Sequence, residues 1–215
     1  MTIYGPNGTV AITKNLTTAF SGDIRIRLAN ERVPAAGIAF DAHDIEAGVV
    51  YERNGVKVNA FATHHGDLIE PNFGYVIEYD GKKAVISSDT TYDERIADRA
   101  KDADLLLHDV ADVNPELLKQ FPRFKEITAH HTAPEEAGRI FSMTHPRLAA
   151  YTHIIVLKAN QPLDVPPTEV LSRTRTTYDG PLVLGEDLMR FEIDKDVSVF
   201  TARKEPVAID AAIKR

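Results

Sequence analysis

Alternating polar and apolar positions mark several strands in the middle of the chain. The stretch "VKVNAFAT" (residues 56–63) alternates as a half-buried strand does. "FGYVIEYDGKKAVISSD" (73–89) predicts two more strands, and Asp80-Gly81 between them is a strong signal for a tight hairpin turn. "DLLLHDV" (104–110) is apolar on both faces, which indicates a buried strand.

Helical periodicity separates the later strands. "TTYDERIADRAKDA" (90–103) has its apolar residues on one face of an amphipathic helix. "APEEAGRIFSMTH" (133–145) predicts a second helix, opened by a proline and acidic residues, and the strand "RLAAYTHIIVL" (147–157) follows. Residues 84–157 therefore alternate strand and helix, which predicts parallel strands joined by right-handed crossovers.

Strands and a helix are also predicted near the two ends of the chain. Residues 1–8 indicate a strand that runs into a turn, and residues 9–20 indicate a helix. Near the other end, the rigid "DVPP" (164–167) precedes a last predicted strand in "PLVLGEDLMRFEI" (181–193). We interpret residues 1–215 as a single α/β domain.

Composition limits the partners, the metal ligands and the cellular location that can be expected. The chain has 215 residues, a formal charge of −7, eight His and no Cys. The acidic balance argues against a general nucleic-acid-binding protein, because neutralising phosphates requires clustered Lys and Arg. Without Cys, a bound metal would need imidazoles and carboxylates. The sequence shows neither a signal peptide nor a membrane-spanning run, so the cytoplasm is the simplest location and no membrane partner is expected.

Groups able to hold a cation or a proton follow or end several predicted strands. They are His65, Asp89, the pair His108-Asp109 and His153. Because the carboxyl ends of parallel strands meet at one edge of an α/β sheet, these groups are expected to converge. Imidazole and carboxylate together suit a first-row metal such as zinc.

Each of these residues also has a purely structural interpretation. Asp89, followed by a threonine, could cap the next helix. His153 could be a hydrogen-bonded core histidine, and His64-His65 could be solvent-facing loop residues. His43 and His145 are assigned to structure or surface.

Several motifs, in order, resemble the metallo-β-lactamase superfamily and within it the ribonuclease Z-like metallohydrolases. The stretches that carry the resemblance are "FATHHGDLIEPNFGYVIEYDGKKAVISSDT", "DADLLLHDV", "ITAHHTAPEEAGRIF" and "PRLAAYTHIIVL". The resemblance implies an αββα sandwich with two metals, Zn²⁺ or alternatively Mn²⁺, at one edge of its sheets. It implies metal-ligand roles for His65, Asp89 and His153, with Asp89 of "SSDT" as the bridge between the metals.

The same resemblance assigns two catalytic residues. "HHT" (130–132) resembles the ribonuclease Z "HST" motif, which implies that His130 donates a proton to the leaving group. "HDVA" (108–111) resembles that branch's "HEAT" segment, and Asp109 is expected to orient His130. The implied activity is hydrolysis by a water that a dinuclear site activates.

The family's H-x-H-x-D-H motif does not occur in the sequence, so an N-terminally incomplete fold is expected. Such a chain would expose core surface and tend to self-associate, and our alternative is a truncated, inactive relative that works as a binding or oligomer-forming module.

Only 24 positions (89 − 65) separate His65 from Asp89, which leaves no room for the family's transfer-RNA-gripping arm. We therefore expect a small ester, lactone, phosphodiester or similar substrate and not transfer RNA. A nucleic-acid-binding module has only "RTRTTY" (173–178) in its favour.

Overall fold

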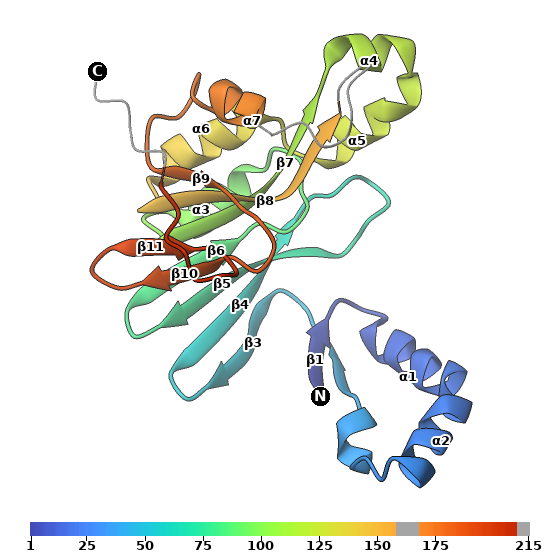
Figure 1. The fold of residues 1–215 in the computed structure, drawn as a ribbon. Coiled ribbons are helices and arrows are strands. Elements are labelled where there is room, and N and C mark those ends of the chain that lie inside the picture. Colours follow the sequence, from blue (N-terminus) through green and yellow to red (C-terminus); the bar gives the residue numbers. More distant parts are fainter. Residues whose placement is uncertain (158–167, 210–215) are drawn as a thin grey trace.

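The computed structural model describes residues 1–157 and 168–209, and its centre is a seven-stranded mixed sheet (Figure 1). The strands are β3 (Gly48–Arg53), β4 (Val56–Thr63), β5 (Asn72–Tyr79), β6 (Lys82–Ile86), β7 (Leu105–Val113), β8 (Leu148–Leu157) and β9 (Leu182–Leu184). They lie side by side in chain order. Pairing is antiparallel from β3 to β6 and parallel from β6 to β9, which confirms the parallel arrangement predicted for residues 84–157.

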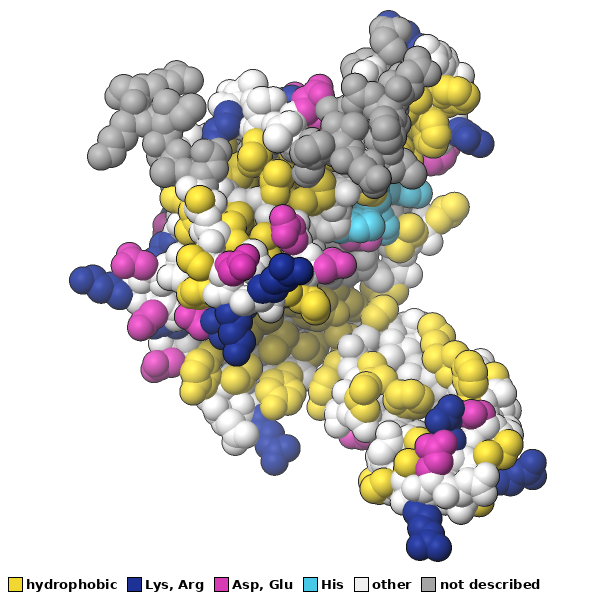
Figure 2. All heavy atoms as spheres, in the orientation of Figure 1, with side chains coloured by type: hydrophobic (Ala, Val, Ile, Leu, Met, Phe, Trp, Pro, Cys, Tyr) yellow, Lys and Arg dark blue, Asp and Glu magenta, His cyan; other side chains and the backbone are white. Residues whose placement is uncertain are grey.

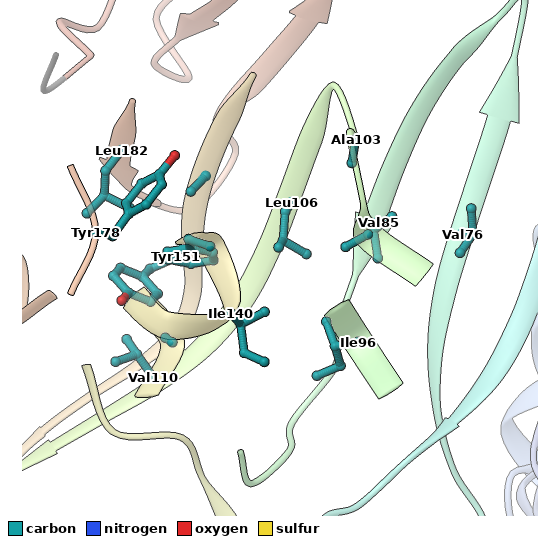
Figure 3. Packing of buried hydrophobic residues seen from close by; sticks show 14 of the residues in the cluster. Val76, Val85, Ile96, Ala103, Leu106, Val110, Ile140, Tyr151, Tyr178 and Leu182 are labelled. Carbon is teal, nitrogen blue, oxygen red and sulfur yellow. The ribbon is translucent and has the colours of Figure 1, made fainter. Parts of the chain in front are cut away.

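Three helices cover one face of this sheet. They are α3 (Glu94–Ala100), α6 (Pro134–Thr144) and α7 (Thr168–Thr174). Figure 3 shows Ile96 of α3 and Ile140 of α6 beside Val85, Leu106 and Tyr151 of the sheet, all of them fully buried. Burial of these apolar side chains supplies the main free energy that holds the helices on the sheet.

The other face of the sheet packs on a small hairpin, β10 (Arg190–Ile193) and β11 (Val197–Phe200). The result is an α/β sandwich, as predicted, with the hairpin as its second β layer. The prediction of one last strand over 181–193 is wrong. The chain leaves the main sheet after β9 and turns through a loop with Leu188 at a positive φ, so β9 and β10 belong to different sheets. The "DVPP" segment at 164–167 lies outside the described residues.

The first 44 residues form a separate layer beside the sheet (Figure 1). It contains β1 (Thr2–Gly5), α1 (Thr9–Ala19), α2 (Ser21–Asn30), the 3₁₀ helix η1 (Ala35–Ile38) and β2 (Asp41–Asp44), and β1 and β2 pair in parallel. Within residues 1–44 only Gly5 and Thr13 are buried. Large apolar side chains are exposed there instead: Val10, Ile12, Leu16, Phe20, Ile26 and Phe40.

A helical excursion that the sequence pattern did not predict separates β7 from α6. It consists of α4 (Pro115–Gln120), the 3₁₀ helix η2 (Pro122–Phe124) and α5 (Lys125–His130). It ends at the His130-His131 pair and so delivers both imidazoles to the sheet edge. Across residues 1–157 and 168–209, no helix is long and apolar enough to span a bilayer.

Arg173 of α7 ties the helical layer to the sheet. Its guanidinium donates to both carboxylate oxygens of Glu135 on α6, at 2.7 Å each, and to Asp112 Oδ1 on β7 at 2.5 Å. Asp112 is buried, and its second carboxylate oxygen has no hydrogen-bond partner among the described residues. The hydrogen bonds from Arg173 lower the pKa of Glu135 below its ordinary value.

Arg173→Ala is expected to lower the free energy of unfolding by about 2–3 kcal/mol at pH 7, because it leaves Asp112 buried and unpaired. The expected loss in free energy of unfolding is smaller than for a fully buried pair, because Arg173 and Glu135 are 31% and 32% exposed. Because the folded-state pKa of Glu135 is depressed, its contribution exists above pH 4.5, and the difference between the proteins should shrink as the pH falls below that value. Urea unfolding at pH 7 and pH 3.5 measures both quantities.

Arg27→Ala is the matched control for this variant. Arg27 also bridges two carboxylates, Asp23 and Glu31, but its side chain and theirs are more than half exposed on α2. Its loss should cost less than about 0.5 kcal/mol. Equal effects of the two substitutions would contradict a stabilising role for the Arg173 network.

Candidate functional site

Four imidazoles gather beyond the carboxyl ends of β4 and β6, beside a bulge in the middle of β8. We call His65, His130, His131 and His153 the imidazole cluster. The ring centre of His131 lies 5.0 Å from that of His65 and 5.1 Å from that of His153, and His130 lies 5.4 Å from His65. Figure 2 shows histidine side chains together on one face of the molecule. The predicted convergence of His65 and His153 at one edge is thus observed.

Asp89 joins this cluster from the loop after β6. Its Oδ2 lies 3.4 Å from His153 Nε2. The interpretation of Asp89 as a helix cap is wrong, because α3 begins at Glu94 and the Asp93 side chain caps it by accepting from the Arg95 N–H. The loop is fixed by Asn72, whose side-chain amide donates to the Asp89 carbonyl at 2.8 Å. The Asp89 carboxylate is therefore free to serve the site.

His153 reaches the site because β8 contains a bulge. Asp109 of β7 pairs with Thr152 and Val110 pairs with Ile154, so His153 is the extra residue, with φ at +46°. A bulge redirects a side chain that regular alternation would place elsewhere. The His153 side chain is 49% exposed, so the interpretation as a core histidine is wrong. A non-glycine residue in this strained conformation is often found at functional sites.

His65 is oriented by the backbone of the neighbouring loop. Its Nδ1 lies 2.7 Å from the carbonyl oxygen of His130, and since a carbonyl can only accept, Nδ1 carries the proton. The Nε2 lone pair is then available to a ligand. Gly66, which follows, has φ at +93°, and a Cβ there would lie 2.5 Å from the His130 ring. Only glycine allows the two loops to approach this closely.

Asp109 holds His131 and not His130, which corrects the predicted contact. His131 Nδ1 donates to Asp109 Oδ2 at 2.8 Å. Since His131 also sits between His65 and His153, its Nε2 is the ring nitrogen left for the site. Sequence reasoning missed His131, although the "HHT" motif offered it as the neighbour of the residue that was chosen.

The His108-Asp109 pair lies inside β7 and not at its end. Both side chains are fully buried. His108 Nδ1 donates to the Asp109 carbonyl at 2.8 Å and lies 3.2 Å from Asp109 Oδ1. Burial would raise the pKa of the Asp109 carboxyl, but the imidazoles of His108 and His131 outweigh it and hold that pKa below its ordinary value. Asp109 is therefore an anion placed behind the imidazole cluster.

The remaining histidines lie elsewhere, as predicted for two of them. His43 is exposed and stacks on Tyr4, and His145 ends α6 in a left-handed conformation. His64 is partly exposed, with Nε2 3.7 Å from Asp67 Oδ1.

The predicted metal ligands have suitable donor atoms but do not form a complete shell. Asp89 and His153 are in contact, and His65 offers a bare Nε2. Within the part of the chain that the structure describes, no group of three or more His, Asp or Glu side chains is arranged to hold a metal ion. The described side chains therefore offer suitable donor atoms without the arrangement of three or four ligands that a zinc site takes.

Comparison with known proteins identifies relatives over most of the chain. A family model described as "Beta-lactamase superfamily domain" matches residues 1–154. The chain is 27% identical over 194 residues to the ribonuclease Z of Mycobacterium marinum, covering 89% of this chain and 67% of that protein.

Solved structures show the same fold at low sequence identity. The metallo-β-lactamase fold protein YhfI from Bacillus subtilis aligns with a TM-score of 0.59 at 14% identity, over 86% of this chain and 62% of YhfI. Zn²⁺-bound PqqB from Methylobacterium extorquens aligns with a TM-score of 0.52 at 15% identity, over 87% of this chain and 60% of PqqB. This chain thus spans about three fifths of each of these two structures.

Proposed function

This chain belongs to the metallo-β-lactamase superfamily, ribonuclease Z-like branch, and on that premise we propose that it is a metal-dependent hydrolase of a small ester, lactone or phosphodiester. The observation that carries the proposal is the imidazole cluster with Asp89 beside it. Five groups able to bind a metal or move a proton arrive there from four separate segments of the chain. Such convergence at one sheet edge is typical of an active site.

His65, Asp89 and His153 are the residues that would hold the metal, with zinc as the first candidate and manganese as the second. A bound metal would supply a hydroxide nucleophile near neutral pH. The described residues provide an incomplete shell for it, and the proposal therefore requires further ligands beyond the three named here.

The proton in this reaction is assigned to His131. Its Nδ1 is fixed by the buried Asp109 carboxylate, which sets the ring orientation and leaves Nε2 toward the cluster. An imidazole held in this way can take a proton from water and return it to the leaving group. His130 is the second candidate for the same role. Its ring lies beside that of His65, and its backbone carbonyl accepts the hydrogen bond from His65 Nδ1.

The proposal is tested by measuring metal and hydrolysis on the same preparation. The purified chain is dialysed against metal-free buffer, and its zinc and manganese are determined by mass spectrometry. We expect at least one equivalent of metal and hydrolysis of p-nitrophenyl butyrate or bis(p-nitrophenyl) phosphate that EDTA abolishes and added Zn²⁺ or Mn²⁺ restores. A metal-free chain that stays inactive after both additions would contradict the proposal.

The alternative is a non-catalytic module that associates with a second copy of this chain. It is favoured by the exposed apolar side chains of α1 and α2 and by the incomplete ligand set. Light scattering after gel filtration distinguishes the two when it is combined with the metal analysis. A metal-free, inactive dimer would support the module, and a metal-loaded, active species in any oligomeric state would exclude it.

A further inference from the structure

A cavity of about 490 Å³ opens directly beside His153. We call it the side pocket. It lies between the middle of β8 and the loop 185–189 that connects β9 to β10, with Leu107 and Phe191 also in its lining. Since His153 lines the pocket and contacts Asp89, a group in this cavity would be next to the proposed reaction centre.

The loop that forms the outer wall is held closely against β8. The Gly185 N–H donates to the Tyr151 carbonyl at 2.9 Å, and a Cβ on Gly185 would lie 2.2 Å from that oxygen. The loop also closes on itself, because the Met189 N–H donates to the Glu186 carbonyl. Backbone hydrogen bonds therefore fix the loop 185–189 against β8, and these two segments enclose the pocket.

The lining combines apolar side chains with negative charge. Leu107, Met189 and Phe191 provide the apolar surface, whereas Leu188 is 82% exposed and adds little to it. The charged residues of the lining are Glu186 and Asp187, and neither Lys nor Arg is among the described residues that form it. An anion entering this cavity would meet two carboxylates without a compensating cation, whereas a cation would be attracted.

We propose that the side pocket binds the non-reacting part of the substrate and selects an apolar group that is uncharged or positively charged. This inference rests on the proposed function for the position of the reaction centre, and it deepens that function by naming the substrate class. It disfavours a polyanion such as RNA, whose phosphates on both sides of the reacting bond would bring negative charge to Glu186 and Asp187. Among the substrates considered above, it favours an ester or lactone with an apolar, non-anionic substituent.

The pocket can be tested without any turnover, because the chain has three methionines and one of them lines it. Labelling with ¹³C-methyl methionine gives signals for Met189 in the pocket and for Met1 and Met143 elsewhere, and Met189→Leu assigns the first. The probes are hexyltrimethylammonium, hexanol and hexanoate, which share a chain length and differ in charge. Tetramethylammonium tests whether the apolar chain is required.

We expect only the Met189 signal to shift. Hexyltrimethylammonium should bind about tenfold more tightly than hexanoate, and the affinity of hexanol should lie between the two. The double substitution Glu186→Gln with Asp187→Asn should reduce that ratio to about twofold. Asp196→Asn, in the turn between β10 and β11 and outside the lining, is the matched control and should keep the tenfold ratio.

Two results would overturn the proposal. One is a Met189 signal that does not move, or that moves together with those of Met1 and Met143. The other is hexanoate binding as tightly as the cation. Because the measurement needs neither metal nor catalysis, its failure is separate from failure of the proposed hydrolase activity, which the EDTA and metal-addition experiment decides.

Discussion

Asp89→Ala and His153→Ala are each expected to remove tightly bound metal and to lower kcat/KM by more than about 100-fold. The two side chains are in contact at 3.4 Å and form the part of the predicted ligand set that the fold brings together directly. Replacing groups that merely orient ligands already costs about 10–100-fold in metal affinity or activity, so loss of a ligand should cost more. Mass spectrometry of dialysed protein and initial rates of ester hydrolysis measure both effects.

The fold should survive these two substitutions. Asp89 and His153 are 41% and 49% exposed, so Ala leaves no cavity in the core. Replacing His153 also leaves the bulge of β8 in place, since the register of the β7–β8 ladder is set by backbone pairing on both sides. The melting temperature is therefore expected to stay within about 2 °C of the parent value.

His43→Ala is the matched control for both variants. His43 is an exposed histidine near a carboxylate, Asp41, as His153 is near Asp89, but it lies on β2 and outside the imidazole cluster. Its substitution should change neither metal content nor rate. Unchanged metal in Asp89→Ala and His153→Ala would mean that the assignment of these ligands is wrong.

Most strands of the central sheet were predictable because they are encoded locally, whereas β3 (Gly48–Arg53) was not predicted. Residues 56–63 and 73–89 carry their own alternation and turn signals, and the buried strands at 104–110 and 147–157 are bounded by amphipathic helices. The region from residue 114 to residue 130 contains three short helices that the sequence pattern did not predict. Each is six residues or fewer, too short for a helical period to be recognised in the sequence.

The site was predictable in its residue types and less so in its contacts. His65, Asp89 and His153 were selected as candidates because strand ends and the family resemblance both pointed to them. The bulge at His153 has no sequence signal, since it depends on the register of β8 against β7. The choice between His130 and His131 was equally hidden, because α5 ends at His130 and the extended backbone of His131 decides which ring faces Asp109.

Asp109→Asn and His131→Ala are each expected to lower kcat about 100-fold while metal content stays unchanged. His131 Nδ1 donates to Asp109 Oδ2, while Oδ1 lies 3.2 Å from His108 Nδ1 and has no hydrogen-bond partner among the described residues. Asn removes the negative charge that His131 Nδ1 faces, so the ring would be held less firmly in the orientation that leaves Nε2 for the site. The double variant should be little slower than either single variant, because the two residues act as one unit.

His130→Ala distinguishes this arrangement from the one predicted by motif alone. If Asp109 and His131 move the proton, His130→Ala should lower kcat only a few-fold and should add independently to Asp109→Asn. A 100-fold loss in His130→Ala that is not additive with Asp109→Asn would restore the motif-based assignment.

A stability measurement checks the contact between Asp109 and His131 separately. Since the folded-state pKa of Asp109 lies below 3.8, the native protein should be more stable than Asp109→Asn at pH 7, and the gap should close as the pH falls below 3.8. A gap that does not narrow at all below pH 3.8 would show that the Asp109 charge is not what holds His131, and kinetic losses in these variants would then need another cause.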